Sequence, residues 1–126
     1  MVLDDSGGPL NIDGTTRYSP SVHADHVRSI GNDLCSYSSG ECFQLGDAST
    51  VPDTITEHML IEGNFIHVCG GKRDGHGHAI YAAQPKHLQI IGNRTVEADS
   101  RGARLHAEVD HTLVVNNIID SFGLIA

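Results

Sequence analysis

Several features that mark other classes of protein are scarce or missing in this sequence of 126 residues. It has no Trp, only 5% aromatic residues and no apolar run of about 18 residues, so no transmembrane span is expected. Lys and Arg number eight against sixteen Asp and Glu, and the net charge of −8 argues against nucleic acid or an anionic membrane surface as a partner. Residues 1–5 lack the basic start and apolar core of a signal peptide, so none is predicted there.

Motifs of common catalytic and metal sites are also missing. Without a CxxC pair, a zinc ribbon is excluded, and no GxSxG or complete GxGxxG motif occurs. The three Cys residues leave their pairing open. Cys42 and Cys69 fall in neighbouring repeats and could form a disulfide that leaves Cys35 free, Cys35 could pair with Cys42 instead, or all three could be buried thiols.

A repeat is the strongest feature that the sequence does contain. In four segments a His stands six residues before an Asn, with an apolar stretch between them. The His residues are His26, His58, His87 and His111, and the Asn residues are Asn32, Asn64, Asn93 and Asn117. Such self-similarity, at steps of 32, 29 and 24 residues between the Asn positions, indicates a repeat architecture.

Each repeat is expected to consist of three short strands. β-Branched residues alternate with polar ones after each His, which is typical of strands. Gly-Asn or Asn-Asn then favours a sharp bend, because both residues tolerate left-handed backbone angles. A second strand follows, and Gly-led third strands are expected at residues 40–45, 77–82, 102–107 and 123–126. This order predicts a parallel β-helix, in which each strand pairs with its counterpart one coil on.

The prediction for the whole chain is one all-β domain over residues 1–126, built as a three-sheet solenoid of about four to five coils. Repeats start near residues 26, 58, 87 and 111, and residues 1–19 could cap one end. The Asn residues should stack at one corner and hydrogen-bond through their amides. Ile61, Ile66, Ile80, Ile90 and Leu105 are expected to point inward. Open strand edges at the coil ends predict self-association as a two-fold dimer, or an excised segment prone to aggregation.

Three segments carry a resemblance to a known family. Residues 39–47, 61–70 and 75–81 resemble bacterial right-handed parallel β-helix proteins of the pectate-lyase-like superfamily, and the likeness runs from about Ala24 to Gly123. The resemblance implies a right-handed coil and an often exported, carbohydrate-facing protein. No motif in the chain matches the acidic calcium cluster and the catalytic Arg or Lys of characterised pectate lyases.

The third strands supply the first candidate site. Strand alternation points Gln44, Tyr81, Arg104 and His106 outward, and the first three should stack over consecutive coils. An amide, an aromatic face and a guanidinium in line predict a platform for a sugar or a uronate, with Arg104 binding a carboxylate through two hydrogen bonds. The alternative is an ordinary solvated sheet face.

The loop before the second of these strands supplies another candidate. Asp74, His76 and His78 could bind a divalent metal, because two His at this spacing can face one way on a strand. His78 could instead be a general base near Tyr81. A plain Gly-rich loop is the simpler alternative, and no other cofactor is implied.

The His column itself is the third candidate. Each of the four His residues follows a charged residue, and stacked imidazoles repel one another when protonated, so the column should respond to pH. Alternatively, the rings only bracket the edge of the coil. The charged residues are Asp25, Glu57, Lys86 and Asp110.

These observations predict a carbohydrate-binding or polysaccharide-processing module that acts through an outward sheet face. If it is an enzyme, we expect a polysaccharide lyase or glycoside hydrolase with Arg104 as substrate clamp, Tyr81 as stacking group or proton donor, and His78 as base. The alternative is a structural or assembly module without a small-molecule site.

Overall fold

The computed structural model describes residues 2–4, 21–22, 25–36, 41–45, 57–70, 77–106, 108–120 and 124–125. These residues form fourteen strands in three sheets whose pairings are all parallel. None of the described segments is a helix that could cross a membrane. The all-β prediction is therefore confirmed.

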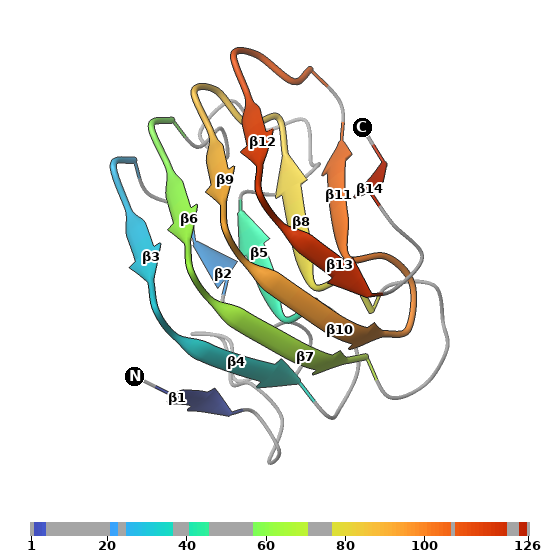
Figure 1. The fold of residues 1–126 in the computed structure, drawn as a ribbon. Coiled ribbons are helices and arrows are strands. Elements are labelled where there is room, and N and C mark those ends of the chain that lie inside the picture. The colour runs from blue at the N-terminus through green and yellow to red at the C-terminus, as the bar shows by residue number, and fades with distance from the viewer. Residues whose placement is uncertain are drawn as a thin grey trace, which may run out of the picture.

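Every third strand along the chain enters the same sheet (Figure 1). Sheet A contains β1 (Val2–Asp4), β4 (Asp33–Ser36), β7 (Phe65–Cys69), β10 (Arg94–Ala98) and β13 (Ile118–Asp120). Sheet B contains β2 (Ser21–Val22), β5 (Phe43–Leu45), β8 (Ile80–Ala83), β11 (Ala103–His106) and β14 (Leu124–Ile125). Sheet C contains β3 (Arg28–Ile30), β6 (Leu60–Glu62), β9 (Gln89–Ile91) and β12 (Leu113–Val115). This arrangement is that of a three-sheet solenoid.

The chain bends where each strand of sheet C leads into the next strand of sheet A. The bends hold Gly31, Gly63, Gly92 and Asn116, with φ of 64°, 62°, 62° and 55°. Glycine has no Cβ and reaches this left-handed region at little cost, and Asn is one of the few other residues that tolerate it. The predicted bends are therefore present, for the physical reason that the sequence indicated.

The Asn residues that follow these bends form a hydrogen-bonded ladder inside the corner. The side-chain amide nitrogen of Asn64 donates to Oδ1 of Asn93 at 2.9 Å, and that of Asn93 donates to Oδ1 of Asn117 at 3.0 Å. Asn32 donates in the same way to Asn64 at 3.2 Å. The predicted Asn stack is confirmed.

The hydrophobic core lies between the three sheets. All five residues predicted to point inward are buried, and Leu34, Leu45 and Leu88 join them. The Gly that leads β11 has a packing role, because a Cβ on Gly102 would lie 2.2 Å from Cγ2 of Ile119.

The cysteines resolve one of the open alternatives. Cys42 and Cys69 form a disulfide, and Cys35 is buried and takes no part in a disulfide. Pairing of Cys35 with Cys42, and three buried thiols, are both wrong. At the other end of the chain, the predicted cap at residues 1–19 lies outside the described residues except for β1, which pairs in parallel with β4.

Candidate functional site

The outward side of sheet B brings together most of the side chains predicted to form a site. Tyr81 pairs in register with Gln44 on one side and with Arg104 on the other. His106 pairs with Ala83 at the end of the same strands. The alternation of inward and outward residues follows the prediction. The inward residues Ile80 and Leu105 are buried, whereas Tyr81, Arg104 and His106 are partly exposed.

Gln44 differs from its expected role. Only 8% of its surface is exposed, so it is covered rather than open to a ligand. The outward line therefore reaches solvent at Tyr81 and Arg104 but not at Gln44.

A compact cluster forms around the Tyr81 ring. The rings of His78 and His106 stack against it, with centroids 5.8 and 6.0 Å from that of Tyr81. The guanidinium carbon of Arg104 lies 5.9 Å from the Tyr81 centroid, and its Nη1 lies 3.5 Å from Nε2 of His78. We call His78, Tyr81, Arg104 and His106 the sheet B cluster. It contains all three residues that the sequence analysis assigned catalytic roles.

The chemistry of the sheet B cluster follows from these contacts. Arg104 can donate to Nε2 of His78 only while that nitrogen is unprotonated, because an accepting imidazole nitrogen needs its lone pair. His78 is fully buried, whereas Tyr81 and Arg104 are partly exposed. The cluster thus offers an aromatic face and a cation near the surface, with an imidazole beneath them.

Sequence reasoning missed Glu41 as a neighbour of this cluster. Cys42 N donates to His78 O at 2.9 Å, which places Glu41 and His78 at the same end of adjacent strands. Glu41 is only 3% exposed, although carboxylates are seldom buried. The available signal was an acidic residue directly before the inward-facing residues of a strand.

The predicted metal site is not described as a whole. Asp74 and His76 lie outside the described residues, and His78 faces Tyr81 and Arg104. In the ranges that the structure covers, no three His, Cys, Asp or Glu side chains converge as metal ligands.

The predicted His column is present beside sheet C. Ring centroids are 4.8 Å apart between His26 and His58, 4.6 Å between His58 and His87, and 5.0 Å between His87 and His111. Each of the four residues has a positive φ, between 49° and 58°. The His residues therefore also form a turn, a role that the sequence analysis did not identify, although His is enriched among non-glycine residues in this region.

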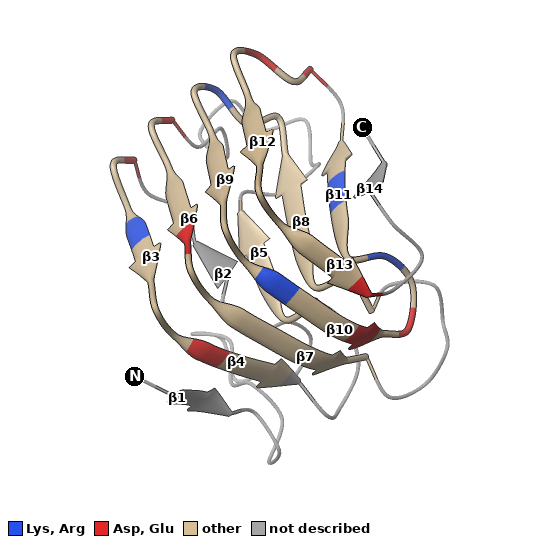
Figure 2. Ribbon diagram, in the orientation of Figure 1, with Lys and Arg blue, Asp and Glu red and all other residues tan. Residues whose placement is uncertain are grey.

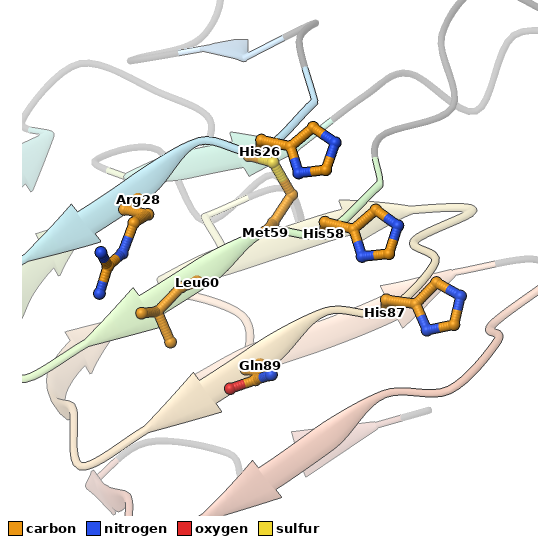
Figure 3. Close-up of a pocket in the computed structure, with 7 residues that line it drawn as sticks. All are labelled: His26, Arg28, His58, Met59, Leu60, His87 and Gln89. Atoms are coloured by element: carbon orange, nitrogen blue, oxygen red, sulfur yellow. The ribbon is translucent and has the colours of Figure 1, made fainter.

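A groove of about 420 Å³ runs beside the His column (Figure 3). Its other side is formed by Arg28, Leu60 and Gln89, which pair in register on β3, β6 and β9. The sequence analysis did not single out these residues. Each follows the repeat His by two positions, which was the available signal.

Comparison with family models, with curated proteins and with solved structures gave no match.

Proposed function

We propose that this protein is a carbohydrate-binding or polysaccharide-processing module that acts through the outward face of sheet B. The observation that carries the proposal is the sheet B cluster, in which two imidazoles stack against the Tyr81 ring and the Arg104 guanidinium lies over it. In the same proposal, the solenoid is right-handed, has about four to five coils and belongs to the pectate-lyase-like superfamily. Export from the cell would accompany that membership.

The residue types of the cluster suit a sugar ligand. An aromatic ring offers a flat apolar face, and its polar tip can still hydrogen-bond. Arg104 can bind a carboxylate or neighbouring hydroxyls through two parallel N–H groups. An acidic sugar uses both features at once, which favours a uronate-containing chain over a neutral one.

A catalytic form of the proposal assigns a role to each group. In a lyase, Arg104 would neutralise the uronate carboxylate and Tyr81 would protonate the departing glycosidic oxygen. His78, the base predicted from the sequence, is fully buried, so the partly exposed His106 on the other side of the cluster is better placed to accept the proton from the adjacent carbon. The electron pair of the broken C–H bond would form the new double bond of the product. In a glycoside hydrolase, buried Glu41 beside His78 would be the first residue to test, because such enzymes use carboxylates.

The test is a glycan-array screen, together with a lyase assay with and without calcium, on the unmodified protein and two arginine variants. Arg104→Gln is expected to lose binding to acidic glycans by about tenfold or more, the effect of losing hydrogen bonds to a charged group. Arg94→Gln is the matched control, because Arg94 lies over Phe65 on sheet A instead. Equal glycan binding by the two variants, or no glycan bound by the unmodified protein, would refute the proposal.

A second candidate function is a structural or assembly module that self-associates through the coil ends. Two exposed apolar side chains support it, Leu113 on β12 and Ile118 on β13, with exposed fractions of 46% and 62%. Both strands are edge strands of their sheets. Unpaired strand edges with apolar side chains recruit further strands. Light scattering at micromolar concentration is expected to show a dimer that dissociates in Leu113→Asp with Ile118→Asp, whereas a monomer of 13.5 kDa for the unmodified chain would contradict it.

A further inference from the structure

We propose that the groove beside the His column binds a small organic molecule with an oxyanion head group, such as a carboxylate, sulfate or phosphate. The groove lies on sheet C, and the sheet B cluster is formed by other residues on another sheet. The inference is therefore independent of the proposed function.

One wall of the groove is a row of imidazoles. His26, His58 and His87 are all exposed, and their rings lie nearly parallel, at 4° and 1° to their neighbours. No hydrogen bond joins their ring nitrogens to another described residue. Within the described part of the chain, a ligand in the groove would not have to compete with a protein acceptor for these N–H groups.

The other side of the groove carries a cation, Arg28, that has no partner among the residues that the structure describes. Across the described ranges, the Arg28 guanidinium makes no ion pair or side-chain hydrogen bond, although acidic residues outnumber basic ones two to one in this chain. Arginine recognises planar carboxylate and phosphate groups through paired N–H donors. Figure 3 shows Arg28, Leu60 and Gln89 in a second row beside the row of His rings, on the same three strands.

The remaining lining residues favour an organic anion over a bare ion. Leu60 stands between Arg28 and Gln89 in the register of sheet C, and Met59 lies below it in the core. The volume of about 420 Å³ falls in the range of small-molecule sites and exceeds what a single sulfate fills. An apolar portion of the ligand would lie against Leu60, and Gln89 can donate to or accept from a further polar group.

Charged neighbours set how the groove should respond to pH. Three carboxylates flank the column: Asp25 accepts from Glu57 N at 2.9 Å, Glu57 pairs with Lys86 at 3.5 Å, and Asp110 contacts His111. Each of these carboxylates belongs to the residue directly before a His of the column. Figure 2 shows them in red at the turns before β3, β6 and β12, and a basic residue in blue at the turn before β9. Stacked imidazoles repel once protonated, and a bound anion relieves that repulsion, so anion binding and proton uptake should strengthen each other.

The experiment is titration of the whole chain with inorganic sulfate and with butyl sulfate at constant ionic strength, followed by calorimetry and by the NMR signals of the His rings. Measurements at about pH 5.5 and about pH 8 lie on either side of the range in which histidine changes charge. Butyl sulfate is expected to bind more tightly than sulfate, and both to bind about tenfold more tightly at the lower pH.

Two matched pairs of variants locate the site. Arg28→Gln should weaken binding by about tenfold or more, and Arg94→Gln should leave it unchanged. His58→Asn should also weaken binding, whereas His111→Asn should not, because His111 lies in the column but outside the lining of the groove. Asn tolerates the left-handed backbone at both positions.

The proposal is supported if Arg28→Gln loses binding, Arg94→Gln keeps it, and the unmodified protein binds more tightly at low pH. Equal binding by Arg28→Gln and Arg94→Gln, or binding independent of pH, would overturn it. Arg28 is exposed, so its replacement should leave the fold intact even if His58→Asn does not.

Discussion

At the scale of single residues, the Asn ladder shows why asparagine recurs at the corner. Asn64 accepts from the backbone N–H of Asn32 at 2.9 Å, and its own amide donates to Ser29 O at 2.9 Å. Asn93 repeats this pattern by donating to Ile61 O at 2.9 Å. One side chain thus satisfies a backbone donor and a backbone acceptor left over at the bend, which needs the carbonyl and the NH₂ of an amide together.

Asn64→Ala should therefore lower the free energy of unfolding by about 2–4 kcal/mol, because it leaves several buried polar groups without partners. The measurement is a urea denaturation curve. Gln89→Ala removes an exposed amide on β9, in the next repeat, and as the control it should change stability by no more than about 0.5 kcal/mol. A loss in Asn64→Ala no larger than in the control would show that the ladder is not needed for stability.

At the scale of elements, each strand of sheet C contributes its middle residue to an inward column across the sheet. In sheet C, Ile90 pairs in register with Ile61 on β6 and with Val114 on β12. Ile61 and Ile90 are both buried in the core, whereas Gln89, the preceding residue of β9, is exposed. The period of two in a strand therefore decides which positions of a three-residue element tolerate charge.

Ile90→Asp should unfold the chain, because an unpaired charge at a buried position costs several kcal/mol. Circular dichroism and thermal melting would report the loss. Gln89→Asp places the same charge one residue earlier on the same strand and should melt like the unmodified protein. A folded Ile90→Asp variant with an unchanged melting temperature would mean that the core assignment is wrong.

At the scale of the whole molecule, the disulfide joins two sheets and two successive repeats. Cys69 is the last residue of β7 in sheet A, and Cys42 directly precedes β5 in sheet B. The link closes a segment with a sequence separation of 27 residues. A cross-link that closes a loop of this length lowers the conformational entropy of the unfolded chain and so stabilises the folded state. This stabilisation adds to that of a hydrophobic core of modest size.

Replacing both Cys42 and Cys69 with Ala should lower the free energy of unfolding by about 3.5 kcal/mol, the chain-entropy value for a loop of this length. Denaturation of the oxidised protein and the double variant, each in guanidinium chloride, measures the difference. The unmodified protein, denatured without reductant, should show one reactive thiol, that of Cys35. Three reactive thiols would contradict the disulfide.

The sequence by itself determined what is local and repeated. Strand alternation predicted the buried Ile residues, and Gly and Asn predicted the bends. The similar residues around Asn64 and its counterparts in the other repeats predicted the stack of Asn side chains. These features follow from backbone sterics and pleat geometry, which act over a few residues and recur in every repeat.

Only the tertiary structure decided which side chains meet. In it, Cys69 is the disulfide partner of Cys42, and Gln44 is buried. Nε2 of His78 lies beside Arg104, and Arg28 lines a groove together with the His column. Loops between strands differ in length and sequence from repeat to repeat, so a single sequence offers no period from which such contacts could be predicted. The physical reason is that register fixes neighbours within a sheet, whereas contacts between side chains of different elements depend on how the sheets and loops pack together.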